Sequence, residues 1–205
     1  MDRLTHVWVV RHGQTEWNAQ SRIQGHTDIG LNEQGRIQAE KLAQALRDEP
    51  INAVYASDLR RAFDTAHAVA AMRGLEVVAD PALRERHFGV YEGLTYEQIE
   101  SQDPHGAKRW RERDPTFGAQ GGETLLEFDE RCRLSVERLA RAHEGQTILL
   151  VAHGGVLDVW YRMAARIALS AARTWEIPNA TVNRLLWSGE GFSLVGWNDG
   201  QHLAG

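Results

Sequence analysis

Hydrophobic positions along the chain follow two alternating patterns. Short runs that are almost wholly apolar lie at 5–10, 53–56 and 147–152, and each has the length of a buried strand. After each run, apolar residues recur every three or four positions, which is typical of a helix with one buried face. Repeated strand and helix order predicts parallel strands covered by helices. We therefore expect a three-layer α/β/α sandwich with a mostly parallel central sheet.

Two further patterns extend this sheet. The run at 75–78 predicts another strand after the second helix. Near the end of the chain, 181–187 and 192–197 alternate hydrophobic and polar positions and are joined by a glycine-bearing turn. This pattern predicts a terminal β-hairpin.

Short polar side chains mark the starts of the predicted helices, because they can accept hydrogen bonds from free backbone N–H groups. Thr95 also has Gln98 three positions later, and this capping box predicts a short helix ending near Gln102. The candidate N-caps are Asn32, Ser57 or Asp58, Thr95 and Thr124.

The regular pattern breaks down between residues 80 and 122. This stretch is crowded with Arg, His, Trp, Gly and Pro, and irregular segments of such length are commonly lids or binding loops. We expect 86–122 to form a lid that determines substrate choice. Its arginines Arg109, Arg111 and Arg113 would favour a substrate with a second anionic group if they face inward. A solvated charged face is the alternative interpretation.

Composition narrows the class of protein. With 205 residues and 42% apolar content, the chain can bury one large core, and we expect a single domain over residues 1–205. The net charge of -5 and the pI near 6.0 argue against the diffuse basic surface of a general nucleic-acid or membrane binder. Any bound anion must therefore meet a local cluster of positive charge.

The sequence also favours a cytoplasmic location. Cys132 is the only cysteine, which excludes an internal disulfide and fits a reducing compartment. The first strand follows the amino terminus too closely to leave room for a signal peptide, and no apolar run approaches the roughly 20 residues of a membrane span.

Candidate chemistry lies where two of the predicted strands end. Arg11-His12-Gly13 follows the first strand, and His153-Gly154 follows the strand at 147–152. Ligands of open α/β sheets bind at the carboxyl ends of the strands, so we expect both imidazoles to project into one crevice. The glycines let backbone and ligand approach closely beside each ring.

A second guanidinium group is expected at the same crevice. Arg61 lies in the first turn of the helix that follows the second strand, and the start of that helix also offers N–H groups to an anion. Two arginines, two imidazoles and a helix start converging on one point describe a phosphoryl site, because the planar guanidinium can bind two phosphoryl oxygens at once.

Five stretches carry a resemblance to a known family: RHGQTEWN at 11–18, SDLRRAFDTA at 57–66, LRERHFGVYEG at 83–93, GGET at 121–124 and VAHGG at 151–155. In content, order and spacing they resemble the histidine phosphatase superfamily, in its phosphoglycerate mutase-like branch 1. The resemblance implies a phosphoglycerate mutase-like fold. The loop after Glu85 is more similar to the phosphatase members than to the cofactor-dependent mutases.

The resemblance implies a role for each matching residue. His12 would be the nucleophile that takes the phosphoryl group, while Arg11, Arg61 and His153 would hold its oxygens. Glu85 would protonate the leaving oxygen and then activate water. Further phosphate or substrate contacts are implied for Asn18, Gln24, Gly25 and Gly154.

These residues also bear on the chemistry of attack. A nucleophilic histidine must be neutral, and like-charge repulsion from Arg11 and Arg61 would lower the pKa of His12. Transfer through a phosphohistidine requires no metal, and the sequence has no metal-binding motif such as H-E-x-x-H. We therefore expect a phosphomonoester hydrolase without a metal or another cofactor, acting on a small phosphorylated metabolite.

Three other functions remain open. A phosphoglycerate mutase would use the same site, and only then would 2,3-bisphosphoglycerate be a cofactor. His12, His153 and Glu85 could instead ligate a metal, although Arg11 and Arg61 would repel it. A binding module for a phosphorylated ligand, without turnover, is the third. Beyond the substrate, we expect neither nucleic acid nor membrane as a partner, and we allow for a homodimer.

Overall fold

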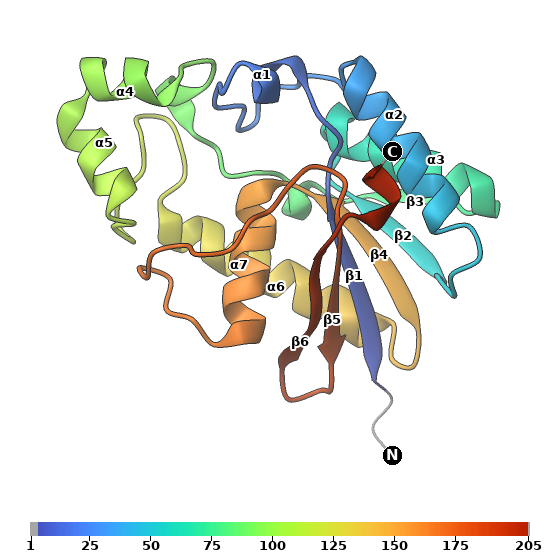
Figure 1. Ribbon diagram of the computed structural model, residues 1–205. Helices are drawn as coiled ribbons and strands as arrows, with labels where there is room; N and C mark the ends of the chain where they lie inside the picture. The colour runs from blue at the N-terminus through green and yellow to red at the C-terminus, as the bar shows by residue number, and fades with distance from the viewer. Residues whose placement is uncertain (1–3, 205) are drawn as a thin grey trace.

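Six strands form one sheet at the centre of the molecule, in the order β3-β2-β4-β1-β5-β6 (Figure 1). The computed structural model describes residues 4–204. The strands are β1 (Thr5–Arg11), β2 (Ala53–Ala56), β3 (Val77–Ala79), β4 (Thr147–Ala152), β5 (Val182–Trp187) and β6 (Phe192–Asp199). Neighbours from β3 to β1 are parallel, whereas β5 is antiparallel to both β1 and β6. The sheet is therefore mostly parallel, and the predicted hairpin forms its antiparallel edge.

Helices cover both faces of this sheet. Alternate side chains of β1 point to opposite faces of the sheet: Val7 and Val9 belong to one apolar cluster, and Trp8 and Val10 belong to a second cluster on the other face. The covering helices are α2 (Glu33–Ala45), α3 (Arg60–Arg73), α6 (Leu125–Ala142) and α7 (Gly154–Ala165). The three-layer α/β/α sandwich expected from the sequence is confirmed.

The ends of β1 and β4 carry the site, and the core holds both strands rigidly. Every residue of β4 is buried, as its unbroken apolar run predicted. Burying a Val, Leu or Ile side chain contributes about 1.5–3 kcal/mol, so the two clusters fix the strands against both helical layers. The loops that follow β1 and β4 consequently start from well-defined positions.

Residues 80–124 leave the sheet and form a separate corner of the molecule, seen at upper left in Figure 1. This segment contains α4 (Tyr96–Gln102) and α5 (Pro104–Arg111), together with short 3-10 helices at Pro81–Leu83 and Gly89–Tyr91. A small apolar cluster of its own holds it together: Tyr91, Ile99, Ala107 and Phe117. The segment expected as an irregular lid thus contains two α-helices and two 3-10 helices, and α5 was not predicted.

Three of the four predicted N-caps are confirmed, since Asn32, Thr95 and Thr124 each accept a backbone N–H of the helix that follows. The prediction for α3 was wrong. Its N-cap is Leu59 rather than Ser57 or Asp58. Asp58 instead binds the guanidinium group of Arg84 at 2.6 Å, so a long-range ion pair takes the carboxylate that local sequence assigned to the helix.

Two short elements complete the described chain, α1 (Glu16–Ala19) after β1 and a 3-10 helix at Gln201–Leu203. Over residues 4–204, none of the helices combines the length and the apolar character of a membrane span.

Candidate active site

The two histidines lie beside each other at the carboxyl end of the sheet. β1 and β4 pair in parallel with Arg11 opposite Ala152, so the residues that follow, His12 and His153, leave the sheet together. Their ring centroids are 5.2 Å apart. Both side chains are buried, at 2% and 0% exposure. The two rings therefore lie side by side, as the two strand ends predict, but only His12 lines the crevice, while His153 is fully buried beside it.

The protonated nitrogen of His12 is determined by its backbone neighbour. Nδ1 lies 2.7 Å from the carbonyl oxygen of Gly13. A carbonyl only accepts hydrogen bonds, so Nδ1 carries the proton of the neutral ring and Nε2 keeps its lone pair. Asn179 Nδ2 donates to the His12 carbonyl at 2.8 Å and holds the peptide between His12 and Gly13 in place. This arrangement leaves Nε2 as the nitrogen that can attack.

Burial and positive charge keep both rings neutral. Burial is the largest cause of the low pKa of His12, and the cations of Arg61 and Arg11 lower it further. The pKa of His153 is lowered in the same way, first by burial and then by Arg61. The sequence predicted the direction of the shift for His12 but attributed it to repulsion alone, whereas desolvation contributes more.

Both arginines line the crevice, and backbone carbonyls accept hydrogen bonds from part of each guanidinium group. Arg61 is fully buried and donates to the carbonyls of Thr27 and Gly25 at 2.9 and 2.7 Å, and Arg11 donates to Ile177 at 2.7 Å. Among residues 4–204, Nε of Arg11, Nε of Arg61 and both ring nitrogens of His153 are buried without a hydrogen-bond partner. Buried donors of this kind are costly unless a ligand satisfies them, so they favour a bound anion.

The start of α3 does not take part, contrary to the sequence-based expectation. Arg60 N donates to Oδ1 of Asp28 at 2.8 Å, so a carboxylate from a neighbouring loop occupies the start of this helix. The N-terminal end of α7 lies at the site instead. A Cβ on Gly154 would lie 3.5 Å from Arg11 Nε, which is an ordinary contact beside the guanidinium group.

The weaker candidates lie on the wall formed by the loop after β1. Asn18 accepts the backbone N–H of Thr15 and completes the capping box of α1, while Gln24 accepts the Thr15 hydroxyl at 2.8 Å. Gly25 has a φ of 53° and presents its carbonyl to Arg61. These three residues line the crevice. The hydrogen bonds described here join them to other residues of the protein and hold the loop in place.

Glu85 closes the crevice from the other side. Its carboxylate accepts the backbone N–H of Gly155 and that of its neighbour Arg86, each at 2.9 Å. A Cβ on Gly155 would lie only 2.3 Å from Glu85 Oε1, so glycine is required for this close approach. The carboxylate and the crevice are thus aligned by the first turn of α7.

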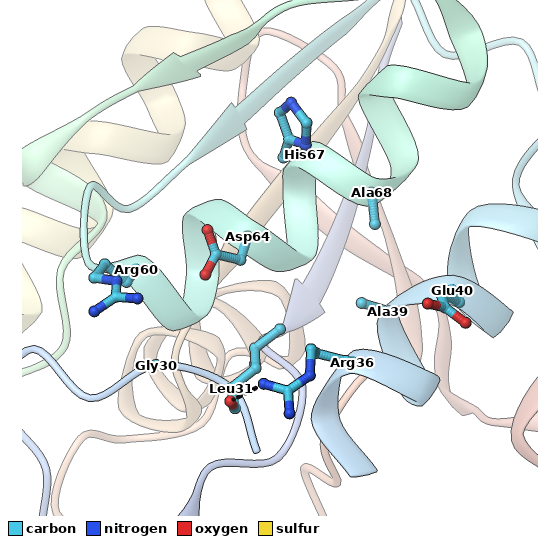
Figure 2. Close-up of a pocket in the computed structure, with 9 residues that line it drawn as sticks. All are labelled: Gly30, Leu31, Arg36, Ala39, Glu40, Arg60, Asp64, His67 and Ala68. Atoms are coloured by element: carbon cyan, nitrogen blue, oxygen red, sulfur yellow. Dashed lines mark hydrogen bonds between the residues drawn. The ribbon is translucent and has the colours of Figure 1, made fainter. Parts of the chain in front are cut away.

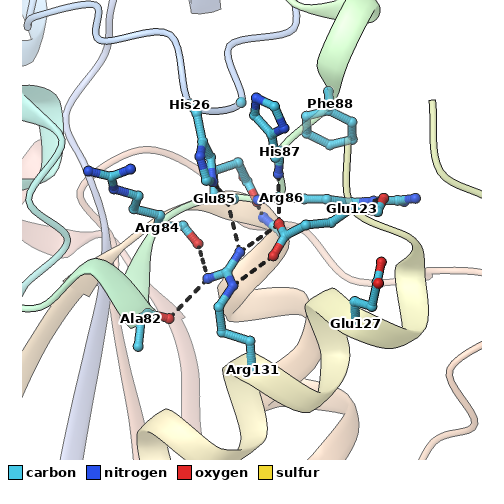
Figure 3. A network of polar contacts seen from close by, with 12 residues as sticks. His26, Ala82, Arg84, Glu85, Arg86, His87, Phe88, Glu123, Glu127 and Arg131 are labelled. Carbon is cyan, nitrogen blue, oxygen red and sulfur yellow. Dashed lines mark hydrogen bonds and ion pairs between the residues drawn. The ribbon is translucent and has the colours of Figure 1, made fainter. Parts of the chain in front are cut away.

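A network that the sequence did not reveal positions the loop of Glu85 (Figure 3). Arg131 of α6 donates to the carbonyls of Ala82, Arg84 and Glu85, and its other bonds go to the Glu123 carboxylate. Glu123 also accepts the backbone N–H of His87 at 2.8 Å. Spacing alone gave no signal for Arg131, because the three carbonyls that it binds lie 46 to 49 residues away.

Glu92 ties the same loop to the residues that hold Arg61. Its carboxylate accepts the backbone N–H groups of His26, Thr27 and Phe88, and the Thr27 hydroxyl. His26 in turn contacts the Glu85 carbonyl through Nε2 at 2.9 Å. The loop at 25–27 and the loop at 85–92 are therefore fastened together, and with them the positions of Arg61 and Glu85.

Two cavities meet at Glu85. The first is the crevice itself, which has a volume of about 180 Å³ and is lined by His12 and Arg61 among others. The second has a volume of about 210 Å³ and lies between the 86–122 segment and α7. Glu85 and Phe88 line both. A groove of about 340 Å³ between α2 and α3 contains Arg36 and Asp64 (Figure 2), but it contains none of the crevice residues.

The donor set does not suit a cation. Residues 4–204 contain no group of three or more His, Cys, Asp or Glu side chains placed to hold a metal ion. Arg11 and Arg61 lie close enough to lower the pKa of both histidines, and their positive charge would repel a metal ion.

Comparisons with known proteins show the family to which the chain belongs. Phosphoglycerate mutase-like protein 4 of Arabidopsis thaliana is 41% identical over 96% of the chain and 86% of its own length. Metal-independent phosphoserine phosphatase of the same plant is 34% identical over 98% of the chain and 84% of its length. The solved structure of Bacillus stearothermophilus YhfR superposes with a TM-score of 0.91 at 30% identity, covering 98% of this chain and all of that one. The family model described as histidine phosphatase superfamily (branch 1) matches residues 7–200, and the chain belongs to this superfamily.

Proposed function

We propose that the protein is a metal-independent phosphomonoester hydrolase that works through a phosphohistidine at His12. The observation that carries the proposal is the free Nε2 of a neutral, buried His12, which lies in a crevice with two guanidinium groups and is closed by the carboxylate of Glu85. Nucleophile, charge stabilisation and acid are then all supplied by the chain itself.

In the first step the Nε2 lone pair attacks phosphorus and the ester P–O bond breaks. The electron pair goes to the leaving oxygen, which takes the proton of Glu85. Arg11, Arg61 and His153 hold the three remaining oxygens, whose shared charge grows in the transition state. Their unpartnered buried donors then gain the bonds that they lack without substrate.

In the second step Glu85, now a carboxylate, takes a proton from water. The water oxygen bonds to phosphorus while the P–Nε2 bond breaks, which releases inorganic phosphate and restores neutral His12. The Gly155 N–H on Glu85 keeps one carboxylate oxygen aligned through both steps. Asn18, Gln24, Gly25 and Gly154 line the crevice and would contact the phosphoryl group or the adjoining part of the substrate.

The test is to replace the nucleophile and look for the intermediate. A His12→Ala variant should lose at least about 1,000-fold in kcat/KM, because the covalent route disappears. Wild-type enzyme mixed with a phosphorylated substrate should yield an acid-labile, alkali-stable phosphoprotein. Retention of most activity by His12→Ala, or failure to trap that phosphoprotein in the wild type, would overturn the proposal.

A phosphoglycerate mutase is the second candidate, favoured by the 41% identity to a phosphoglycerate mutase-like protein. A mutase must return the phosphoryl group to the product rather than to water, and it would use 2,3-bisphosphoglycerate; the hydrolase uses no cofactor. Incubation with 3-phosphoglycerate separates the two functions. The hydrolase releases inorganic phosphate, whereas rapid isomer formation with little phosphate would identify the mutase.

We also propose a cytoplasmic location and a homodimer. The single, buried Cys132 supports a reducing compartment, and exposed Leu194 and Val195 on the edge strand β6 support self-association. Cell fractionation tests the location. Light scattering of the purified chain at several concentrations tests the dimer.

A further inference from the structure

The peptide group between His12 and Gly13 is held by a side chain at each of its polar atoms. Its carbonyl oxygen accepts a hydrogen bond from Nδ2 of Asn179 at 2.8 Å, and its N–H donates to Oγ1 of Thr65 at 3.0 Å. Thr65 belongs to α3, whereas Asn179 belongs to the loop before β5. Because a peptide group is planar, a rotation of this one would break both hydrogen bonds at once. The peptide next to His12 is therefore fixed by two distant parts of the chain.

The next carbonyl along the chain, that of Gly13, is the one that accepts the hydrogen bond of His12 Nδ1. Its direction depends on the backbone angles of Gly13, and glycine restricts those angles less than any other residue. Glycine is required here, since a Cβ would lie 2.5 Å from the carbonyl oxygen of Gly35. The restraint that Gly13 itself lacks must come from its surroundings, and Asn179 and Thr65 supply it.

We propose that Asn179 is a positioning residue for the nucleophile: its amide holds the His12 carbonyl, which keeps the Gly13 carbonyl directed at Nδ1 and leaves the lone pair on Nε2. The inference rests on the proposed function, because it concerns the histidine that takes the phosphoryl group. Asn179 is not among the residues that line the crevice, so it acts through the backbone rather than on the substrate.

Asn179 can serve as a fixed support because the residues on both sides of it are bound. The N–H of Ala180 donates to the carbonyl of Arg11 at 2.8 Å, and the carbonyl of Ile177 accepts from the Arg11 guanidinium group at 2.7 Å. Ala180 has a φ of 58°, in the left-handed region that is uncommon for residues other than glycine. His202 contacts the Ala180 carbonyl through Nε2 at 2.9 Å. These contacts hold the loop against the end of β1.

The same amide reaches the wall of the crevice. Nδ2 of Asn179 lies 3.4 Å from Oδ1 of Asn18, and Asn18 lines the crevice. An amide nitrogen carries two hydrogens, so it can donate to the His12 carbonyl and to Asn18 together. An aspartate in place of Asn179 would have nearly the same size but no hydrogen for either oxygen.

The Gly13 carbonyl matters most once the phosphoryl group is on the ring. Burial is the largest cause of the low pKa of His12, followed by Arg61 and Arg11, whereas the hydrogen bond to Gly13 raises this pKa. Bonding of Nε2 to phosphorus gives the ring a positive charge, and a hydrogen bond from a charged donor is roughly twice as strong as a neutral one. A misdirected Gly13 carbonyl should therefore slow formation of the phosphohistidine. Phosphate binding depends on the two arginines and should change little.

Two variants of Asn179 and a matched control test the inference. Asn179→Ala removes the amide, and Asn179→Asp keeps its size but not its hydrogens. The control is Asn183→Ala. Asn183 is a buried asparagine of β5 that donates to the Val9 carbonyl of β1 at 3.1 Å, and its other hydrogen bonds also go to residues away from His12. The control measures what the loss of an asparagine beside β1 does to stability alone.

The first readout is the tautomer of His12, measured by the NMR chemical shifts of its two ring nitrogens at neutral pH and assigned with the His12→Ala variant. We expect Nδ1 alone to carry the proton in the wild type and in Asn183→Ala. Both Asn179 variants should give a mixture in which Nε2 is protonated in part. A loss of stability alone would not change this signal.

The second readout is the rate of phosphohistidine formation. With enzyme in excess over 4-nitrophenyl phosphate, release of 4-nitrophenol measures this step. Both Asn179 variants should be slower by about 10- to 100-fold, because a displacement of about 1 Å at a reacting group can cost about 100-fold. The Kd for inorganic phosphate should stay within about threefold, since the guanidinium groups that bind it are unchanged. Asn183→Ala should match the wild type in both measurements.

A wild-type tautomer in both Asn179 variants, or rates within about threefold of the wild type in both, overturns the inference. So does an equal loss of rate in Asn183→Ala, which would assign the effect to lost stability. The proposed function stands in each of these cases, because the wild type still forms its phosphohistidine. If no phosphoprotein can be trapped in the wild type, the proposed function is overturned and the inference with it.

Discussion

Two adjacent glycines at the start of α7 face different sides of the site, one the phosphoryl-binding side and the other the acid side. Gly154 faces the guanidinium of Arg11, whereas Gly155 faces the carboxylate of Glu85. The two positions are adjacent, yet the space beside them differs by more than an ångström: a Cβ would lie 3.5 Å from its nearest atom at Gly154 and 2.3 Å at Gly155. Substituting each in turn therefore perturbs the phosphoryl side and the acid side separately.

Gly155→Ala should lower kcat for alkyl phosphates by about 10- to 100-fold, because the added methyl group displaces Glu85 from the leaving oxygen. The rate on 4-nitrophenyl phosphate should fall much less, since its leaving group needs little protonation. Gly154→Ala is the matched comparison: its Cβ would make only an ordinary contact beside Arg11, so any loss should be equal on the two substrates. An equal loss on both substrates in Gly155→Ala would show that the acid was not the group disturbed.

Among the elements, α6 contributes most to the acid loop without entering the crevice. The pKa of Glu123 is lowered: burial acts against this, but the hydrogen bonds from Arg131 and His87 outweigh it. The pair is thus a charged one, and it holds three carbonyls of the segment at 82–85 through Arg131. Arg131 is a positioning residue in this arrangement.

Arg131→Met should reduce kcat for alkyl phosphates by about tenfold or more with little change in KM, because the loop keeps its contacts to Glu92 but loses the alignment of Glu85. Arg131→Lys should recover part of the loss, since an ammonium group restores the charge but not the planar fork. Arg133→Met, on the same helix and paired with Asp129, is the control. The positioning role is contradicted if Arg131→Met lowers the free energy of unfolding but leaves the ratio of the rates on alkyl and aryl phosphates unchanged.

The elements differ in how well the sequence predicted them. β2 and β4 have their predicted bounds because their apolar runs are bounded by polar residues on both sides. α5 was missed because Pro104 and Gly106 are typical of loops, although Asp103 as N-cap with proline at the first helical position was a usable signal. The start of α3 and the role of Arg131 depend on partners distant in sequence, Asp28 and the 82–85 segment, which local patterns do not contain.

For the whole molecule, we propose that the chain is one cooperative domain. The sheet is continuous across all six strands, and the segment at 80–124 is tied back to it through α6 and Glu92. Calorimetry should give a single unfolding transition with equal calorimetric and van't Hoff enthalpies. Two separable transitions would identify the 80–124 corner as an independent unit.

The buried histidines make this stability depend on pH. The pKa values of His12 and His153 lie well below 6.5 in the folded chain, and the unfolded chain regains ordinary values near 6.5. Below that pH the unfolded state binds protons that the folded state does not bind. The free energy of unfolding is therefore highest above about pH 6.5 and decreases as the pH falls. Each histidine contributes up to about 1.4 kcal/mol per pH unit to this decrease.

Thermal unfolding between pH 7 and 5 measures the effect. His153→Gln should flatten the fall in Tm over this range, whatever it does to Tm at pH 7, whereas substitution of the exposed His105 should not. His26 and His202 also have lowered pKa values, so part of the slope remains in the variant. An unchanged slope in His153→Gln would mean that His153 is not the group that titrates.

Glu85 stands between two spaces that draw most of their walls from different parts of the chain. The phosphoryl crevice is lined mainly by the end of β1 and the loop that follows it, whereas the second cavity is lined mainly by the 86–122 segment, α6 and α7. Mutations can therefore accumulate around the second cavity without touching the residues proposed to handle phosphorus. Such a division gives directed evolution a practical route: randomising Trp110 and Arg113, which line only the second cavity, should yield phosphatases for new alcohols on an unchanged chemical core.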